Sequence, residues 1–269
     1  MSNTDIAFSG SIPVLYETYM GPLIFRPYAE DIASRLSGLA SGRILETAAG
    51  TGIVTRALDK TLPAGVKIIA TDLNQPMLDH AASLLVSDRV TWQKADAQSL
   101  PFADGSFDAV VCQFGVMFLP DRIKAYQEAR RVLKPGGTFL FNVWDKLENN
   151  ELAETVTATV AQLFPDNPSY FLARTPHGYH DTVRILSELR SAGFTDIAFE
   201  TVTRRSKAPS AREPAIGYCQ GTPMRNEINS RDPNRLGEVT EAAATNIAAR
   251  FGHGTVDGKI QAHVIAAKC

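Results

Sequence analysis

The sequence predicts an α/β fold in which a largely parallel β-sheet carries helices on both faces. Short apolar and β-branched runs alternate with segments of helical period, and the connections between them are short. This alternation, repeated from about residue 43 to residue 144, is typical of parallel strands joined by helices. The chain has 269 residues, of which 44% are hydrophobic, so it can bury a large core within a single domain.

The first half of the chain contains five predicted strands and the helices between them. Helices are expected where apolar residues recur every three to four positions, at residues 28–39, 53–60, 77–86 and 122–133. The last of these ends before Pro135, which cannot continue a helix. The expected strands are residues 43–46, 66–70, 90–93, 108–113 and 138–144.

The pattern becomes less regular after Trp144. Helices are expected at residues 148–163 and 183–192, separated by a connection rich in proline and aromatic residues. Two further strands, at residues 197–202 and 261–267, complete a sheet of seven. The segment of roughly 50 residues between these two strands is polar in character, with a helical pattern at 238–250. A connection of that length inside a compact domain is usually a lid or an added subdomain.

Composition excludes several classes of protein. Lysine and arginine total 27, and aspartate and glutamate total 29, so the formal net charge is −2. A chain this close to neutral disfavours a nucleic-acid partner. The three cysteines are widely spaced and match neither a disulfide framework nor a metal site, so we expect a reducing compartment and no metal. Residues 1–13 do not resemble a signal peptide, and no apolar stretch could span a bilayer. We therefore expect a cytoplasmic protein without membrane insertion.

The turn after the first predicted strand carries a Gly-x-Gly pattern, Gly50–Thr51–Gly52. Glycines there let a ligand approach the backbone, and the following helix offers free N–H groups. Asp72 lies 20 positions after Gly52, at the end of the second strand, where a carboxylate can accept both hydroxyls of a ribose. A helix cap or a local turn is the alternative role for Asp72.

The same turn fits a dinucleotide-binding dehydrogenase less well. That fingerprint needs a third small residue three places after the second glycine, where this chain has Thr55. The preceding strand ends in Glu46, and a carboxylate aimed at the turn would repel a pyrophosphate. It suits a ligand that carries its own ammonium or sulfonium group.

These residues and their neighbours resemble the class I S-adenosylmethionine-dependent methyltransferases. Residues 46–52 resemble motif I of that family and residues 71–77 its second motif. Residues 95–108 are similar to the adenine-binding loop and fourth strand, and residues 129–137 to the segment that joins a helix to the fifth strand. Within the family, the resemblance is strongest to the branch related to the ubiquinone/menaquinone C-methyltransferases, which often has a segment like residues 21–29.

The resemblance implies a Rossmann-like seven-stranded methyltransferase sheet, mostly parallel with an antiparallel last strand and with helical cap insertions. Its parts would be an N-terminal helical segment (1–41), a cofactor-binding core (42–145), cap insertions (146–182 and 206–257) and the C-terminal part of the sheet (183–205 and 258–269). The implied activity is in-line transfer of a methyl group from S-adenosyl-L-methionine to oxygen, nitrogen or carbon of a small organic acceptor, leaving S-adenosyl-L-homocysteine.

The resemblance also implies the roles of individual residues. Glu46 and the Gly50–Gly52 backbone would hold the methionine portion, Asp72 the ribose, and Leu73 and Asp96 the adenine. Tyr16 or Tyr19 would close over the carboxylate of the cofactor. The whole expected cofactor-binding set is Tyr16, Tyr19, Glu46, Ala48, Gly50, Thr51, Gly52, Asp72, Leu73, Met77, Asp96, Ala97, Gln113 and Phe114.

The acceptor side of the reaction has weaker candidates. His177 or His180 could deprotonate a hydroxyl acceptor, although both also fit ordinary loop or surface histidines. An aromatic pocket would suit an apolar or aromatic acceptor. Its candidates are Phe118, Trp144, Tyr170 and Phe171, for most of which core packing is the alternative.

Two other functions use the same features. A nicotinamide-dependent oxidoreductase shares the architecture. Thr55 and the adenine-type loop at Asp96 both disfavour this function. A non-catalytic S-adenosylmethionine-binding protein would keep every motif named above. It would differ in whether an acceptor can reach the methyl group.

Overall fold

The computed structural model describes residues 12–269. Residues 1–11, where the sequence predicts no signal peptide and the beginning of the N-terminal helical segment, lie outside the described residues. Seven strands form one sheet in the order β3-β2-β1-β4-β5-β7-β6. The strands are β1 (Gly42–Glu46), β2 (Val66–Asp72), β3 (Val90–Lys94), β4 (Phe107–Gln113), β5 (Leu133–Trp144), β6 (Asp196–Ala208) and β7 (Val256–Lys268).

The predicted mixed sheet is confirmed. β1 pairs in parallel with β2 and β4, and the ladder continues in parallel to β3 on one side and β5 on the other. The C-terminal end of β7 lies beside the beginning of β5, because Cys269 and Gly136–Gly137 exchange backbone hydrogen bonds of 2.9 Å. β7 is therefore antiparallel to β5.

Two compact units divide the chain. The sheet unit comprises Arg26–Val143, His180–Thr201 and His263–Cys269, and the helical unit comprises residues 12–25, Trp144–Tyr179 and Val202–Ala262. Strands β6 and β7 each contribute residues to both units. The segments of the helical unit overlap the predicted cap insertions; that they cover the cofactor site stays a prediction.

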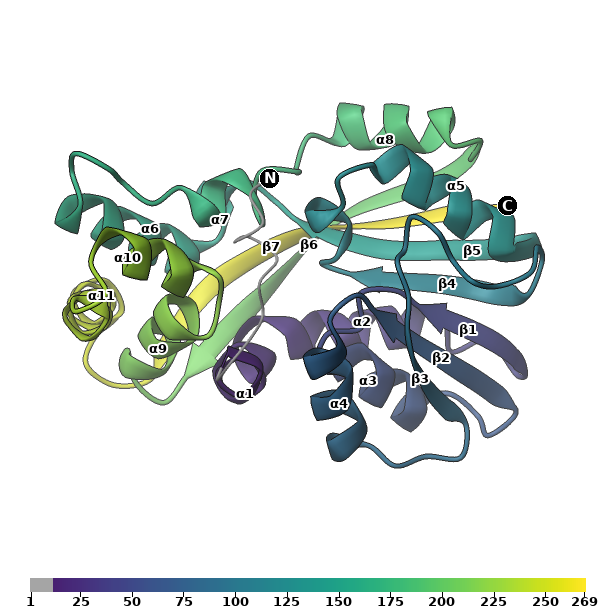
Figure 1. The fold of residues 1–269 in the computed structure, drawn as a ribbon, viewed down its shortest axis with the longest axis horizontal. Coiled ribbons are helices and arrows are strands. Elements are labelled where there is room, and N and C mark those ends of the chain that lie inside the picture. The colour runs from purple at the N-terminus through teal and green to yellow at the C-terminus, as the bar shows by residue number, and fades with distance from the viewer. Residues whose placement is uncertain (1–11) are drawn as a thin grey trace. The chain divides into compact units, whose positions relative to one another are not determined.

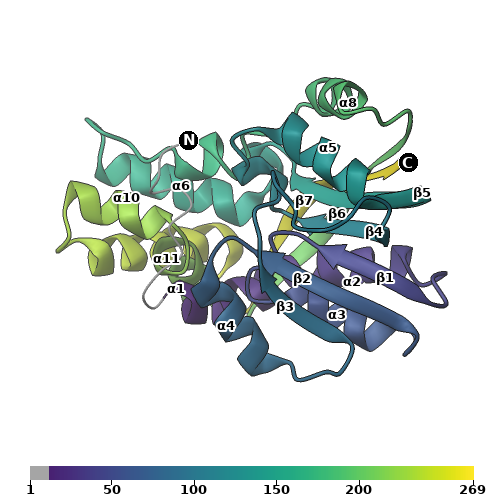
Figure 2. The same ribbon diagram turned by 45° about the vertical axis from the view of Figure 1, so that its right-hand side comes forward.

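In the sheet unit, helices cover both faces of the sheet (Figure 1). α2, α3 and α4 lie on one face, and α5 and α8 lie on the other. The view from a second direction shows the same arrangement (Figure 2). Between them the strands bury a continuous apolar core that includes Ile44, Ile68, Val110 and Phe141. The helices are α2 (Arg26–Arg35), α3 (Ile53–Thr61), α4 (Gln75–Leu84), η3 (Val116–Phe118), α5 (Arg122–Val132) and α8 (Thr182–Ser191).

In the helical unit, α11 packs against α6 and α9, and α9 packs against η2. η2 is a π-helical segment that contains Pro22, and Gly217 of α9 lies against its Tyr19 and Met20. The helices are α1 (Ile12–Leu15), η2 (Tyr16–Phe25), η4 (Leu147–Asn149), α6 (Glu151–Leu163), α7 (Phe171–Arg174), α9 (Arg212–Gln220), α10 (Met224–Arg231) and α11 (Leu236–Phe251).

The observed elements extend the predicted ones. β6 and β7 each run for 13 residues, so the polar segment predicted at 206–257 begins and ends within strands and contains three helices. Between residues 12 and 269, no helix is both long and apolar enough to cross a membrane.

Candidate functional site

Strand order reverses between β1 and β4, and ligands of open α/β sheets bind at such a point, beyond the carboxyl ends of the strands. The turn after β1 is held there from both sides. Ala49 N donates to Thr71 O of β2 at 2.9 Å, and Thr47 N donates to Val111 O of β4 at 2.8 Å. These bonds fix a turn in which Ala48 adopts a φ of 53°, an uncommon conformation for a residue with a Cβ. Such strain is typical of functional turns.

The two glycines of the turn serve different purposes. A Cβ on Gly52 would lie 2.6 Å from the Trp92 ring, so Gly52 is needed for close packing within the unit. A Cβ on Gly50 would meet only the Met77 methyl group, at 3.7 Å. Gly50 adopts a φ of 55° and leaves space above the turn, as a ligand that approaches the backbone requires.

Asp72 ends β2 and turns its carboxylate toward the same turn. Its Oδ2 accepts a hydrogen bond from Gly50 N at 2.8 Å, and its Oδ1 accepts one from Asn74 N at 2.8 Å. Burial raises the pKa of this carboxyl group, and the backbone bonds partly oppose that shift. Both predicted roles of Asp72 are compatible, since an oriented carboxylate that makes a local turn can still accept ligand hydroxyls. The next residue, Leu73, is 53% exposed, which leaves an apolar surface open beside it.

Glu46 lies at the end of β1 and is 1% exposed. Its Oε2 accepts a hydrogen bond of 2.6 Å from Thr55 Oγ1, which is also buried. Burial raises the pKa of Glu46 to about 8, and the negative charge of Asp72 acts in the same direction. The Thr55 hydroxyl and the charge of Arg56 oppose the rise. A buried carboxyl group of this kind is stabilised as the anion by a cationic ligand.

The end of β4 lies beside the turn after β1. Phe114 follows the strand with a φ of 49°, and its N–H donates to Asn142 Oδ1 of β5 at 2.9 Å. Its ring meets that of Tyr28 edge-on at 5.3 Å. A Cβ on Gly115 would lie 2.5 Å from the Ala48 Cβ, so the two turns are in contact.

The loop after β3 carries the third predicted carboxylate. Ala95 N donates to Asp72 O at 3.1 Å, and Asp96 Oδ1 accepts from Gln98 N at 2.8 Å. Arg131 of α5 holds the following residues, since its guanidinium donates to the carbonyl oxygens of Leu100 and Phe102. Sequence reasoning gave Arg131 no role, although it lies in the segment at 129–137 that carries part of the family resemblance.

A methyltransferase domain model matches residues 45–141, which span all of these turns. The ubiquinone/menaquinone biosynthesis C-methyltransferase UbiE of Pseudomonas aeruginosa (strain LESB58) is 32% identical over 182 residues, covering 62% of this chain and 71% of the relative. The chain belongs to the class I S-adenosylmethionine-dependent methyltransferases. It is an enzyme that uses S-adenosylmethionine as methyl donor.

Solved structures share the fold of this methyltransferase. A phosphoethanolamine N-methyltransferase 2 of Haemonchus contortus in complex with S-adenosyl-L-methionine has a TM-score of 0.63 at 18% identity, covering 98% of this chain and 58% of that one. The [4+2]-cyclase SpnF has a TM-score of 0.60 at 20% identity, covering 96% and 92%. The fold alone is therefore shared by a protein named for another reaction. The sequence relationship is what sets aside the oxidoreductase alternative.

The methyltransferase brings together most of the predicted cofactor residues in its sheet unit. The space over Gly50, the oriented Asp72 carboxylate and the exposed Leu73 suit a nucleoside with a cationic tail, so the residues present fit the cofactor. The predicted residues of this unit are Glu46, Ala48, Gly50, Thr51, Gly52, Asp72, Leu73, Met77, Asp96, Ala97, Gln113 and Phe114.

The predicted aromatic and histidine residues divide between the units. In the helical unit, the Tyr16 ring stacks on Phe25 at 4.9 Å, Phe25 lies 6.1 Å from Trp144, and Trp144 lies 5.9 Å from His177. We call these four residues the aromatic row. Sequence reasoning named three of its members separately and missed Phe25, which links them.

The remaining candidates differ in exposure. Of the two other predicted pocket residues of the helical unit, Phe171 is buried, whereas Tyr170 is 57% exposed. Tyr19 belongs to η2 of the same unit, and its closing over the cofactor carboxylate, like that of Tyr16, stays a prediction. His180 and Phe118 belong to the sheet unit. Among residues 12–269, no group of three or more His, Cys, Asp or Glu side chains could hold a metal ion.

His177 is not a surface histidine, because only 5% of it is exposed. Its Nδ1 lies 2.8 Å from the carbonyl oxygen of Asp145. A carbonyl oxygen can only accept, so Nδ1 carries the proton and, in the neutral ring, Nε2 carries the lone pair.

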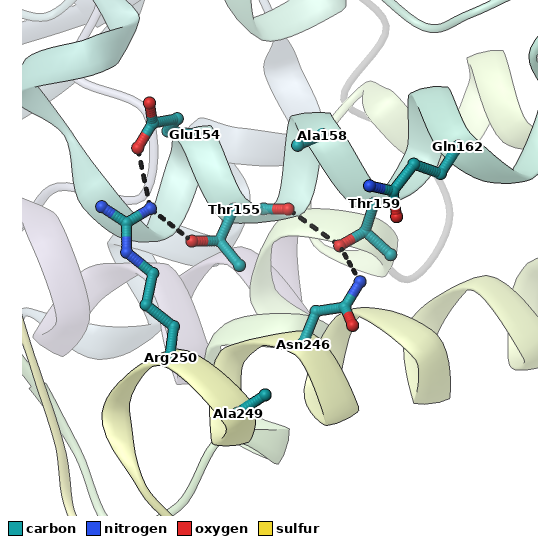
Figure 3. A pocket seen from close by; sticks show the side chains of 8 residues that line it. All are labelled: Glu154, Thr155, Ala158, Thr159, Gln162, Asn246, Ala249 and Arg250. Atoms are coloured by element: carbon teal, nitrogen blue, oxygen red, sulfur yellow. Dashed lines mark hydrogen bonds and ion pairs between the residues drawn. The ribbon is translucent and has the colours of Figure 1, made fainter.

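A polar groove between α6 and α11 contains none of the predicted site residues (Figure 3). Arg250 crosses it to Glu154 at 2.7 Å and to Thr155 at 3.0 Å, and Asn246 donates to Thr159 at 2.9 Å. These side chains bind one another across the groove. Their position is therefore explained by the packing of α6 against α11.

Proposed function

We propose that this methyltransferase transfers the methyl group to a small organic acceptor with a planar, partly apolar body. The observation that carries the proposal is the aromatic row, in which three rings and the His177 imidazole follow one another at 4.9–6.1 Å. Phe25, Trp144 and His177 are buried, and rings of this kind would give an acceptor site flat apolar walls with a polar group at the His177 end. The near-neutral charge supports a small molecule over a nucleic acid, and the cysteine pattern supports a cytoplasmic location.

We further propose how the chain holds the donor. Asp72 accepts the ribose hydroxyls, Leu73 packs against the adenine, and Asp96 with the backbone of Ala97 binds the adenine edge. Glu46 faces the cationic methionine portion above the turn at Gly50. When bound, the cofactor supplies a methyl group on a positively charged sulfur. The protein then needs only to align the acceptor and exclude water.

If the acceptor atom is a hydroxyl oxygen, we propose His177 as the general base. The Asp145 carbonyl holds the ring in the tautomer whose Nε2 can take a proton. A nitrogen or carbon acceptor that loses no proton in the rate-limiting step would leave this residue dispensable. His180 is the alternative base and belongs to the sheet unit.

The test is release of S-adenosylhomocysteine in the presence of phenols, catechols, quinols and aromatic amines, with oligonucleotides and peptides as comparison acceptors. We expect turnover with at least one planar small molecule. On a hydroxyl acceptor, His177→Ala should lower kcat about 10²-fold or more and His180→Ala should not. Turnover with only the macromolecular acceptors would contradict the proposal.

A further inference from the structure

Asn142 has one half of its side chain bound and the other half unsatisfied. It lies on β5 and is 0% exposed. Its Oδ1 accepts the hydrogen bond from Phe114 N at 2.9 Å, which fixes the orientation of the amide. Its Nδ2 is buried and has no hydrogen-bond partner among residues 12–269. Leaving a buried donor unsatisfied is unfavourable, so such groups usually receive a partner from a ligand or water.

The surroundings of Asn142 indicate which ligand. It is paired in register with Gln113, the last residue of β4. Phe114, which it binds, is followed by Gly115, and Gly115 is in contact with Ala48 of the turn after β1. The unsatisfied amide therefore lies in the sheet unit at the carboxyl ends of the strands, within the group of turns that fits the methionine portion of the cofactor.

Only one group in the methionine portion of the cofactor is a suitable acceptor for the Asn142 Nδ2 hydrogen bond. An amide N–H needs an acceptor, and the ammonium and sulfonium groups of the cofactor are positively charged. The carboxylate is the remaining polar group, and charge-assisted hydrogen bonds to carboxylates are strong.

We propose that Asn142 binds the cofactor: its Nδ2 donates a hydrogen bond to the carboxylate of S-adenosylmethionine while its Oδ1 holds the backbone of Phe114. One amide thus both shapes the turn after β4 and recognises the ligand beside it. The proposal rests on the placement of the methionine portion at these turns. Asp72→Ala tests the nucleoside side of that placement separately, because the ribose contact does not involve Asn142.

Calorimetry with two ligands tests the proposal. S-Adenosylhomocysteine carries the carboxylate, whereas 5′-methylthioadenosine lacks the whole amino-acid portion. Asn142→Asp keeps the acceptor for Phe114 N and replaces the donor by a carboxyl oxygen. We expect its Kd for S-adenosylhomocysteine to rise about tenfold or more and its Kd for 5′-methylthioadenosine to stay within about twofold.

Two further variants complete the design. A buried aspartic acid can stay protonated and still donate, so Asn142→Leu removes the donor in any protonation state. Asn229→Asp repeats the same chemical change on α10 of the helical unit, at another side chain with an unsatisfied atom, and should leave both affinities unchanged. Thermal unfolding of each variant establishes that it is folded.

The proposal is overturned if both Asn142 variants bind S-adenosylhomocysteine within about twofold of wild type. It is equally overturned if the affinity for 5′-methylthioadenosine falls as much as that for S-adenosylhomocysteine. In that case Asn142 only shapes the site.

Discussion

Thr55 donates a hydrogen bond of 2.6 Å to Glu46, and both side chains are fully buried next to the turn after β1. At this position a dinucleotide-binding turn needs a small residue for packing. Here a hydroxyl group holds a carboxyl group whose pKa burial raises to about 8. The pair therefore makes the stability of the protein and its binding of a cationic ligand depend on pH.

The stability effect has a defined sign. The pKa of Glu46 is about 8 in the folded protein and near its ordinary 4.5 in the unfolded chain, so the folded state holds an extra proton between these pH values. This contribution to the free energy of unfolding is fully present below about pH 4.5 and is lost as the pH rises to about 8. Glu46→Gln keeps an acceptor for Thr55 and removes the titration. In urea unfolding, we expect the stability of Glu46→Gln relative to wild type to rise by up to several kcal/mol between pH 5 and pH 8.5. A pH-independent difference would contradict the buried, protonated Glu46.

Cofactor binding should release this proton. The ammonium group, which S-adenosylhomocysteine shares with the methyl donor, favours the ionised form of Glu46, so below about pH 8 binding converts the acid to its anion. Calorimetry of S-adenosylhomocysteine at pH 7, in buffers of different ionisation enthalpy, should show proton release in wild type and less of it in Glu46→Gln. Equal proton release in the two proteins would assign the proton to another group.

Asp72→Ala should weaken binding of S-adenosylhomocysteine by about 1.5–3 kcal/mol, the scale of a hydrogen bond to a charged group. The variant also loses the bond that orients Gly50 N, so its effect is expected at the upper end of that range. Asp79→Ala on the exposed side of α4 is the matched control, since within residues 12–269 the Asp79 side chain binds only Gln75, at the surface. Equal affinities of the two variants in calorimetry would remove the ribose assignment.

Gly52→Ala should destabilise the protein more than Gly105→Ala. The two glycines have similar φ values, 79° and 62°, so both substitutions strain the backbone by about 1–2 kcal/mol. Only at Gly52 would the new methyl group overlap the Trp92 ring. We therefore expect an additional loss of about 1–3 kcal/mol for Gly52→Ala, measured by chemical unfolding. Equal losses would mean that Trp92 moves aside without cost.

Arg131→Ala should loosen the loop that follows Asp96. Its guanidinium binds the carbonyl oxygens of Leu100 and Phe102 and the carboxylates of Glu128 and Asp104. We expect a loss of about 1–3 kcal/mol in stability and faster hydrogen exchange in residues 97–104. Arg131→Lys keeps the charge but not the fork of donors, so it should restore little. Full restoration by lysine would show that charge alone holds the loop.

Local patterns were enough to predict the architecture. The β-branched run that begins at Val66, the helical period after Gly52 and the stop before Pro135 each depend on neighbouring residues, and the corresponding elements are present. The lengths of β6 and β7 were underestimated, because residues 203–208 and 256–260 carry several charged side chains, although both stretches alternate between buried and more exposed positions in the structure. The three helices between them fall in a polar segment with only one clear helical period. Packing of α9 and α11 against α6 or η2, and of α10 against α7, α9 and α11, stabilises them.

The chemistry of the site was predictable only where a motif is local. Glu46, Gly50 and Asp72 lie at strand ends with recognisable spacing. Asn142 and Arg131 were missed because their partners are 28 and 29 residues away and nothing in a single sequence links them. The only signal was that Asn142 is a polar residue within the otherwise apolar run at residues 139–144 of β5.

Thermal unfolding with S-adenosylhomocysteine, and separately with NADH, tests the central claim most directly. A ligand at about 100 times its Kd adds about 2.7 kcal/mol of stability, worth several degrees in Tm for a chain of this size. If the turn between Glu46 and Asp72 holds the donor, S-adenosylhomocysteine will raise the Tm of wild type and will raise that of Asp72→Ala much less, and NADH will not change either. A shift with NADH alone, or an equal shift in Asp72→Ala, would contradict this account of the site.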